Sequence, residues 1–272
     1  MGEWSVASIA EQWRQAAAER NRYLAPATEV MFALARIGRG MRVLDLGTGS
    51  GDVAIMAAER VGALGSVLAT DASDAMVQSA SLAVREAGAS IVKVRRMDAR
   101  TIDLREASFD VVLARMVLMF VDDLTLTLRG VRRVLAPGGR FAATTWSALA
   151  NNPFQAAMID VAREEGPLPE PVPEFVRAFR LSDPDALRQA GEAAGLHEVE
   201  VRAVAGERCV PSIADELERQ KSWPLVAGIF ASLDDTKKRR AWTEVERRLR
   251  GFERPNGGAV FPTEVLVLCA SR

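Results

Sequence analysis

The nine residues Val43-Leu44-Asp45-Leu46-Gly47-Thr48-Gly49-Ser50-Gly51 place a short apolar run directly before a glycine-rich loop. The apolar run predicts a buried strand, and the residues from Asp52 to Val61 predict the helix that follows it. Glycines in such a loop tolerate positive φ angles and let a ligand approach the backbone amides, while the helix N-terminus adds partial positive charge. Tight turns also use glycine, so the loop alone leaves two interpretations open, a ligand site and a simple turn.

The alternation of strands and helices continues as far as Trp146. The expected strands are 43–46, 66–70, 91–94, 109–114 and 140–146. The expected helices between them are 52–61, 73–87 and 123–135, and Pro137-Gly138-Gly139 is expected to turn the chain into the last strand. Strands that alternate with helices indicate βαβ units and a parallel sheet, whose right-handed crossovers place helices on both faces.

The alternation stops after Trp146. Residues 147–180 contain a short helix near 154–163 and then four prolines between 167 and 173, which exclude a central strand and indicate an inserted cap with a stiff connector. The remaining segments are a helix at 182–195, a strand marked by Val199 and Val201, helices over 212–252, and a strand at 260–269. We expect the last two strands to pair antiparallel, with the helices of 212–252 inserted between them.

The predicted fold is therefore α/β, a doubly wound, mostly parallel seven-stranded sheet with an antiparallel last strand and helical cap insertions. We divide the chain into an N-terminal helical segment (1–37), a core (38–147), a cap insertion (148–180) and a C-terminal part of the core (181–272) with a helical insertion at 212–252. Within the first segment, the pattern predicts a helix from Val6 to Ala17, a break at 21–26, and a second helix that ends near Ile37.

Composition excludes several classes of protein. The 35 lysines and arginines nearly balance the 36 aspartates and glutamates, so a broad non-specific nucleic-acid surface is not expected. Two cysteines, Cys209 and Cys269, and one histidine, His197, cannot form a disulfide scaffold or a cysteine- or histidine-rich metal centre, and no metal is expected.

The sequence also carries no targeting signal that we recognise. Residues Met1–Ser5 lack a charged-then-apolar signal pattern, and no window approaches 18 uncharged apolar residues. We therefore expect a cytoplasmic protein without a membrane span.

Three aspartates fall at the carboxyl ends of neighbouring predicted strands. Asp45 precedes the glycine loop, Asp71 ends the second strand about twenty residues beyond the loop, and Asp98 follows the third strand. Open α/β sheets bind ligands at this edge, where Asp71 can accept both hydroxyls of a ribose, Asp98 an adenine amino group, and Asp45 a ligand ammonium. Each aspartate alone could be a helix cap or a turn residue, but three at one edge favour a nucleoside site.

The loop residues indicate which nucleoside is bound. The Gly-Lys-Ser/Thr sequence of a phosphate-binding loop is absent, and Asp52 stands where a dinucleotide fingerprint has its last glycine. Asp45 and Asp52 flank the loop, which disfavours a pyrophosphate and favours a cationic ligand. The only tyrosine, Tyr23, lies upstream of the sheet, so the Tyr-x-x-x-Lys pair of a nicotinamide reductase is missing.

At this point the sequence resembles a known family. The matching motifs are Val43–Gly51, Thr70-Asp71-Ala72, Met97-Asp98-Ala99, Phe109-Asp110-Val111-Val112 and Val134–Arg140. They resemble the successive motifs of class I S-adenosylmethionine-dependent methyltransferases, and most closely those of the small-molecule group of ubiquinone and menaquinone biosynthesis (UbiE-like). The resemblance spans residues 35–147 and implies a Rossmann-like methyltransferase fold with S-adenosylmethionine as methyl donor and S-adenosylhomocysteine as product.

The resemblance implies roles for the residues around the loop. Gly47, Thr48 and Gly49 would contact the methionine part of the cofactor, beside Asp45, and Asp71 would hold the ribose.

It also implies an adenine pocket. Ala72 and Met76 would flank the adenine, and Asp98 and Ala99 would lie at its edge. Arg115 follows the fourth strand, where the family lines the site near the sulfonium and the acceptor; the alternative is a surface salt bridge.

Methyl transfer from a sulfonium requires that the acceptor be aligned with the methyl group, and it requires no protein nucleophile. A general base is needed only when the acceptor is poorly acidic. Tyr23 and Arg115 are weak catalytic candidates, and His197 is expected on the surface opposite the cofactor site.

Large apolar residues after the core could line an acceptor pocket, although packing within the cap is the stronger interpretation for most of them. These residues are Phe154, Met158, Phe175, Phe179, Trp223, Leu225, Phe230 and Leu233.

The sequence thus predicts S-adenosylmethionine-dependent methyl transfer to an oxygen or carbon of a small, hydrophobic or aromatic metabolite. One alternative is an RNA or protein methyltransferase that uses the basic stretch 237–250, which we expect instead to be a solvated helix face. Another is an S-adenosylmethionine-binding protein without transfer activity. The acceptor, the methylated atom, the use of a general base and the oligomeric state, including a homo-oligomer, stay open.

Overall fold

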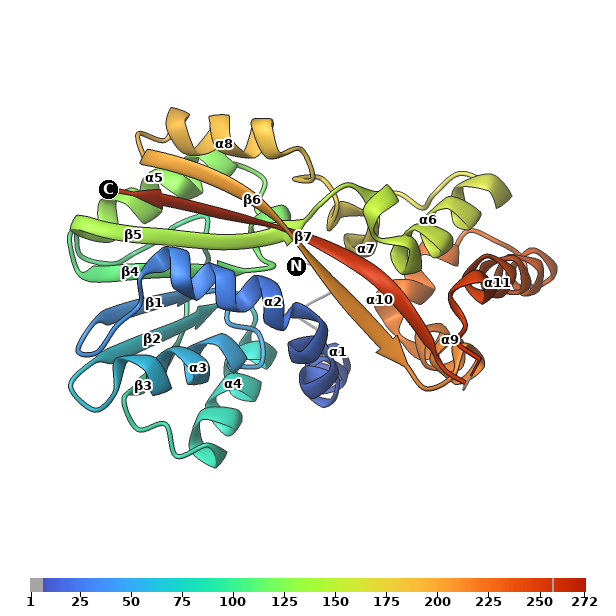
Figure 1. Cartoon of the computed structure of the whole chain (residues 1–272), viewed down its shortest axis with the longest axis horizontal. Helices are drawn as coiled ribbons and strands as arrows, with labels where there is room; N and C mark the ends of the chain where they lie inside the picture. The colour runs from blue at the N-terminus through green and yellow to red at the C-terminus, as the bar shows by residue number, and fades with distance from the viewer. Residues whose placement is uncertain (1–6, 256) are drawn as a thin grey trace.

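A computed structural model of the chain describes residues 7–255 and 257–272 (Figure 1). Met1–Ser5 and Val6, on which the expectations for a signal sequence and a first helical residue rested, lie outside the described residues. The strands are β1 (Arg42–Leu46), β2 (Ser66–Asp71), β3 (Val92–Arg96), β4 (Phe109–Arg115), β5 (Leu135–Trp146), β6 (His197–Val210) and β7 (Ala259–Ser271). The helices are α1 (Ala7–Gln15), α2 (Ala17–Ala35), α3 (Asp52–Val61), α4 (Asp74–Glu86), α5 (Leu124–Val134), α6 (Pro153–Glu165), α7 (Glu174–Arg177), α8 (Pro184–Ala193), α9 (Ile213–Ser222), α10 (Pro224–Ala227) and α11 (Asp235–Leu249).

The seven strands form one sheet in the order β3-β2-β1-β4-β5-β7-β6. The strands β1 to β5 pair in parallel, and β7 pairs antiparallel with both β5 and β6. The expected doubly wound sheet with an antiparallel last strand is therefore confirmed. Since the order reverses between β1 and β4, the carboxyl ends of these two strands bound the crevice in which such sheets bind ligands.

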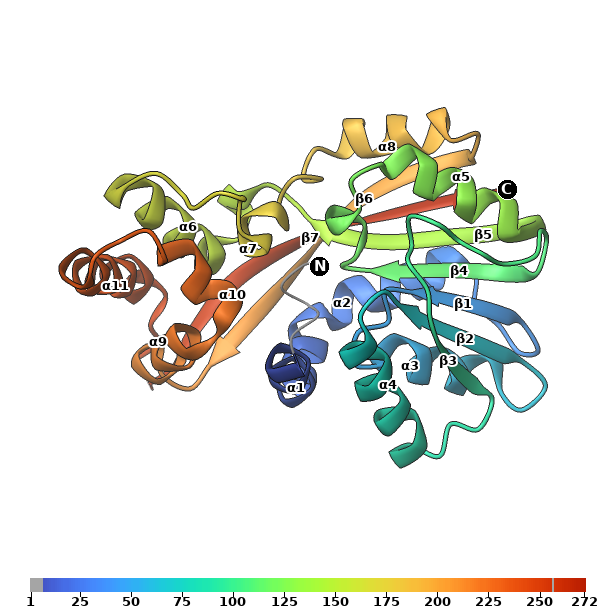
Figure 2. The same ribbon diagram turned by 180° about the vertical axis from the view of Figure 1, so that it is seen from behind.

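Helices cover both faces of the sheet (Figures 1 and 2). On one face, apolar residues of α2 and α3 pack with Val43, Val111 and Val267 of the strands. On the other, α5 and α8 pack against residues such as Leu44 and Val112. Successive residues of a strand point to opposite faces of the sheet, and both faces are covered by apolar helices. The parallel strands are therefore nearly continuous apolar runs in the sequence.

The last two strands are longer than expected and extend beyond the sheet. Strand β5 pairs with β7 only as far as Trp146 and Val265, so the first part of β7 pairs with β6 alone as a two-stranded arm. Helices α6, α9, α10 and α11 gather around this arm (Figure 2), and α6, α9 and α11 form a third apolar cluster with Phe261 of β7. The arm part of β6 contains the run Ala-Gly-Glu-Arg at residues 205–208, which is why its apolar signal fades there.

The expected break at residues 21–26 is wrong. Helix α2 runs through these residues with Pro26 inside it, and the interruption lies at Ala16. An internal proline costs a backbone hydrogen bond. Pro26 is exposed, however, while Leu24, Met31 and Phe32 on the other side of the helix are buried against the sheet, and this packing outweighs the local preference.

The expected turn at Pro137-Gly138-Gly139 is also wrong, because β5 already begins at Leu135. The register shifts there: Leu135 pairs with Phe109, and the next pair joins Arg140 to Val111. The extra residues form a bulge in which Gly138 takes a φ of 74°, a conformation that glycine adopts without strain.

No helix in the described ranges is both long and apolar enough to span a membrane.

Candidate functional site

A cleft of about 560 Å³ lies at the carboxyl ends of the parallel strands. All ten residues expected at a cofactor line it, namely Asp45, Gly47, Thr48, Gly49, Asp71, Ala72, Met76, Asp98, Ala99 and Arg115. The structure thus brings together positions spread over 70 residues of sequence, in a volume typical of small-molecule sites.

The glycine loop has the backbone that its sequence predicts. Gly47, Gly49 and Gly51 have φ angles of 62°, 57° and 88°. A Cβ atom on Gly47 would lie 2.2 Å from Cγ2 of Val117, so the loop passes too close to the segment after β4 for any side chain. The amide of Thr48 donates to the carbonyl of Thr70 (2.9 Å), which ties the loop to β2. Glycine is required here both for conformation and for space.

Asp71 ends β2 with its carboxylate over the loop. Its Oδ2 accepts from the amide of Gly49 (3.0 Å), and its Oδ1 accepts from the amide of Ser73 (3.0 Å). Burial raises the pKa of Asp71, and the hydrogen bonds from these amides partly offset that effect. Each carboxylate oxygen can accept a further hydrogen bond. The two oxygens of Asp71 could therefore accept hydrogen bonds from the two hydroxyls of a ribose.

Asp45 is the most deeply buried acid of the cleft, with 1% of its surface exposed. Burial raises its pKa to about 7, while the nearby Thr48 hydroxyl and Arg115 lower it by less. Thr48 and Asp45 are close but not aligned as a full hydrogen bond, because Oγ1 of Thr48 and Oδ2 of Asp45 are both buried without a partner in the part of the chain that the structure describes. A buried acceptor that no described residue satisfies suits a cationic ligand group, which would favour its ionised form.

Asp52 does not have the role that its position beside the loop suggests. Its Oδ2 lies 2.5 Å from Arg20 and 3.3 Å from Arg115. Arg115 also donates to Asn21 (2.9 Å), and Arg20 to Ser50 (2.8 Å). Asp52 is therefore neutralised, and Asp45 and Asp71 are the acids of the loop region that remain for a cation.

Arg115 is consequently not a surface salt bridge. Its side chain is 7% exposed and its pKa is lowered, chiefly by burial. Arg20, 5% exposed at the side chain, joins it from α2. Two buried guanidinium groups that share one close carboxylate leave an excess of positive charge at this end of the cleft, which suits a ligand carboxylate.

Sequence reasoning missed Arg20. It lies in a helical stretch without a recognisable motif, and only tertiary folding brings it beside a residue 32 positions away.

The residues expected around an adenine differ in their surroundings. Met76 and Ala99 are buried and Ala72 is exposed at the rim. Asp98 is held by the side chain of Arg100, with Nη2 to Oδ2 at 2.6 Å, and this contact holds its pKa below the usual range. An adenine amino group would therefore share or displace Arg100 at this carboxylate.

Two side chains of α7, Glu174 and Arg177, line the cleft opposite the sheet. Arg177 donates to Glu174 (3.0 Å) and to Asp122 (3.0 Å), and Asp122 lies 3.7 Å from Arg100. A chain of ion pairs thus connects the end of β3 to α7 across the mouth of the cleft. None of these residues carried a motif in the sequence.

Tyr23 is not among the residues that line the cleft. Its ring stacks on Trp146 with centroids 6.3 Å apart, and Trp146 stacks on Phe179 at 5.8 Å. This three-ring stack joins α2, the end of β5 and the segment after α7, so Tyr23 packs these parts together.

His197 begins β6 opposite Ser271, at the amino end of the parallel strands and exposed. Its expected place on the opposite surface is confirmed. None of the eight apolar candidates lines the cleft in the described part of the chain. Phe154, Met158, Phe230 and Leu233 belong instead to the buried third cluster.

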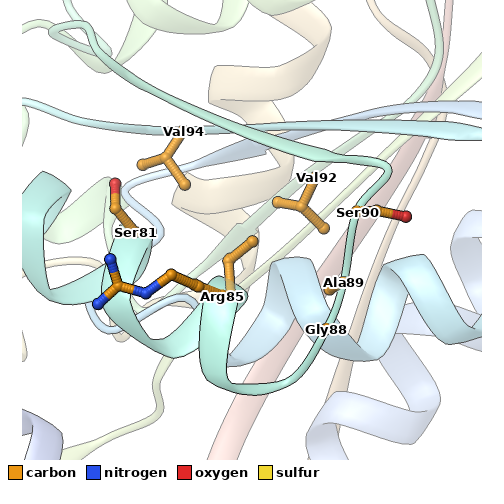
Figure 3. A pocket seen from close by; sticks show the side chains of 8 residues that line it. Ser81, Arg85, Gly88, Ala89, Ser90, Val92 and Val94 are labelled. Carbon is orange, nitrogen blue, oxygen red and sulfur yellow. The ribbon is translucent and has the colours of Figure 1, made fainter.

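A second hollow of about 410 Å³ lies where α4 returns to β3 (Figure 3). Gly88, Ala89 and Ser90 form this return, so the hollow lies at the amino end of β3, away from the glycine loop. It contains no residue expected at a cofactor.

The family model described as "Methyltransferase domain" matches residues 37–174. The chain is 29% identical over 180 residues to the ubiquinone/menaquinone biosynthesis C-methyltransferase UbiE of Idiomarina loihiensis, covering 62% of this chain and 72% of that protein. It is 34% identical to nocamycin O-methyltransferase of Saccharothrix syringae, covering 63% and 67%.

A solved S-adenosylmethionine-dependent methyltransferase from Aquifex aeolicus matches the fold with a TM-score of 0.51 and 18% identity, covering 89% of this chain and 87% of that one. The family model and the relatives agree with the resemblance that the sequence motifs indicate. The chain belongs to the class I S-adenosylmethionine-dependent methyltransferases.

Proposed function

We propose that this S-adenosylmethionine-dependent methyltransferase acts on an oxygen or carbon of a small, hydrophobic or aromatic metabolite. The observation that carries the cofactor part is one cleft that holds the positive-φ glycines, the carboxylate of Asp71 and the buried Oδ2 of Asp45, which has no partner among residues 7–255 and 257–272. Asp45 suits an ammonium group, the glycines allow the ligand to lie close to the loop, and Asp71 suits a ribose.

Several of the ten expected residues take defined roles in this proposal. Asp45 holds the ammonium, Gly47–Gly49 lie along the methionine part, and Asp71 accepts from the ribose hydroxyls. Arg115, with Arg20 beside it, holds the carboxylate.

The adenine part lies between Ala72 and Met76, with Asp98 and Ala99 at its edge. When bound, the cofactor supplies an activated methyl group on a positively charged sulfur. The protein residues align the acceptor, exclude water and hold the charges of the donor in place.

The nature of the acceptor is supported by the lining and by the relatives. Met116, Val117, Phe120 and Val121, which follow β4, give the cleft an apolar wall. The two relatives are named for C-methylation in quinone biosynthesis and for O-methylation of nocamycin. An apolar or aromatic ring that carries an ionisable hydroxyl fits both the wall and these precedents.

Nucleic acid is not part of the proposal. The arginines of the basic stretch 237–250 mostly pair with glutamates: Arg240 with Glu165, Arg247 with Glu244, and Arg250 with Glu246. A helix face whose charges are paired in this way is a solvated surface more than a phosphate-binding one.

We also propose the division into 1–37, 38–147, 148–180 and 181–272. The third apolar cluster supports a cap made from both 148–180 and the insertion 212–252.

A cytoplasmic location is supported by the free, exposed thiol of Cys209, because free thiols are disfavoured in an oxidising compartment.

Calorimetric titration with S-adenosylhomocysteine tests the cofactor site. Asp71→Ala should weaken binding by about 1–3 kcal/mol, because two donors of the ligand lose their acceptor. The matched control is Asp110→Ala, an acid at the amino end of β4 that pairs with Arg42, and it should leave affinity unchanged. Unchanged affinity for Asp71→Ala, or binding of NADPH in place of S-adenosylhomocysteine, would contradict the assignment.

Transfer of a labelled methyl group tests the acceptor class. Phenols, naphthols and 1,4-naphthohydroquinone should be methylated, whereas bulk RNA and protein should not. Labelled RNA or protein instead would support the macromolecular alternative, and cofactor binding without any transfer would support a binding protein.

A further inference from the structure

Glu174 is the carboxylate that the cap contributes to the cleft. It opens α7, and α7 packs against the turn Leu118–Phe120 that follows β4. Phe120 and Val121 of that segment line the same cleft. Glu174 therefore lies beside the apolar wall that would receive an acceptor.

The two oxygens of Glu174 have different surroundings. Oε1 accepts from Nη1 of Arg177 at 3.0 Å. Oε2 is buried and has no hydrogen-bond partner among residues 7–255 and 257–272. The side chain as a whole is 13% exposed. A buried carboxylate oxygen without a donor is costly, so its place in the structure calls for an explanation.

The other acids that line the cleft are committed elsewhere. Asp45 and Asp71 lie at the glycine loop, and Asp52 is shared by two arginines. Three more are exposed or tied to arginines, namely Asp74 with Arg96, Asp98 with Arg100, and Asp122 with Arg177.

Burial raises the pKa of Glu174, and Asp122 raises it further, while Arg177 and Arg180 lower it. The two elements that pack most closely on α7, which are α10 (Pro224–Ala227) and the turn Leu118–Phe120, contain no titratable residue. Desolvation is thus the leading influence on it. A carboxylate whose pKa is raised toward the working pH is a more effective proton acceptor than an ordinary surface glutamate.

We propose that Glu174 is the general base of the transfer reaction and that the acceptor presents a weakly acidic hydroxyl, or a ring activated by one, to its carboxylate. This inference rests on the proposed function, since it names the group that receives the acceptor's proton.

In this reaction Glu174 takes the proton of the acceptor hydroxyl, and the O–H electron pair stays with the acceptor. For transfer to oxygen, that electron pair forms the new bond to the methyl carbon. For transfer to carbon, it becomes the π bond of a carbonyl, and a π pair of the ring forms the new bond to the methyl carbon. The old carbon–sulfur bond breaks with its electrons on sulfur, which becomes neutral. After transfer to carbon, the substituted ring carbon loses its proton to water, the C–H electron pair restores the aromatic ring, and the carbonyl π pair returns to the oxygen. Protonated Glu174 returns its proton to water.

The first test compares Glu174→Gln with the wild type on acceptors of graded acidity. The amide keeps an oxygen for Arg177 but cannot take a proton. With 2-naphthol, a weak acid, kcat should fall by about 10²–10⁴-fold with little change in KM. With a nitro-substituted naphthol that is already ionised at the assay pH, the fall should be less than about tenfold, because no base is needed.

The matched control is Glu170→Gln, an exposed glutamate on the same connector, which should leave both rates unchanged. Affinity for S-adenosylhomocysteine should be equal in all three proteins. An equal loss with both acceptors, or no loss with either, would overturn the role of Glu174.

The second test does not depend on turnover. Carboxyl-¹³C glutamate labelling, with the Glu174 signal assigned by its loss in Glu174→Gln, gives the pKa directly. A pKa above that of an ordinary glutamate is expected, and one at or below it would overturn the proposal. If the wild type methylates no phenol or naphthol although it binds S-adenosylhomocysteine, the proposed acceptor class fails, and the titration still decides on Glu174.

Discussion

At the carboxyl edge of the sheet, the buried groups include Asp45, Arg20 and Arg115. In the cap, the third cluster buries aromatic and aliphatic side chains such as Phe154, Phe230 and Phe261. The cap also buries charge, but there Arg208 and Glu216 pair directly at 2.6 Å, whereas at the edge of the sheet the buried Oδ2 of Asp45 has no partner among the described residues. This difference indicates that the sheet edge is shaped for a ligand and that the interior of the cap is shaped mainly by folding.

The largest effect should come from the interior of the cap. Phe230 is 2% exposed and packs on Trp242 with ring centroids 4.8 Å apart. Phe230→Ala should lower the free energy of unfolding by about 3–5 kcal/mol in urea titrations. Affinity for S-adenosylhomocysteine should change less than about twofold at temperatures where the variant is folded. A parallel collapse of affinity would show that the two regions do not differ in the way described.

A smaller effect is expected at the glycine loop. Gly47 and Gly88 both have a φ of 62°, but only Gly47 would place a Cβ against a neighbour, whereas at Gly88 nothing lies within 4 Å. Gly88→Ala should cost about 1–2 kcal/mol of stability through strain alone and spare binding. Gly47→Ala should cost more in thermal unfolding and also lower affinity for S-adenosylhomocysteine in calorimetry. Equal effects of the two substitutions would remove the steric argument.

Asp45→Asn should weaken cofactor binding and remove a pH-dependent loss of stability. Asp45 has a pKa of about 7 when folded and 3.8 as its ordinary value. Folding thus takes up a proton between these values. The wild type loses stability as pH rises from about 4 to above 7, by at most about 4 kcal/mol.

The Asn variant should lack this loss in urea titrations across pH, and should bind S-adenosylhomocysteine about 1–3 kcal/mol more weakly above pH 7. Wild-type affinity should fall as Asp45 becomes protonated below pH 7. Identical pH profiles of stability for the two proteins would disprove the assignment.

The smallest effect is predicted for the basic stretch. Lys237→Glu combined with Lys238→Glu changes two side chains on α11, far from the residues that line the cleft. Methyl transfer to the small acceptor should change less than about twofold, and fluorescence anisotropy should detect no salt-dependent RNA binding by the wild type. Strong RNA binding that the substitutions abolish would favour the macromolecular alternative.

What the sequence predicted was local in the chain. The glycine loop and Asp71 are read from neighbouring residues, because strand, turn and helix each have a short pattern, and helix α3 begins and ends at the expected residues. The Arg20–Asp52–Arg115 cluster joins residues up to 95 positions apart, and Glu174 follows a proline-rich connector without a motif. Such groups are brought together only by tertiary packing, which also holds α2 helical through Pro26.

The most direct measurement is a crystal structure of the protein with S-adenosylhomocysteine. We predict ribose hydroxyls within hydrogen-bond distance of the Asp71 carboxylate and the ligand ammonium beside Oδ2 of Asp45, with Gly47–Gly49 along the chain between them. A ligand bound elsewhere, or bound in the cleft while both carboxylates contact only protein and water, would contradict the central claim.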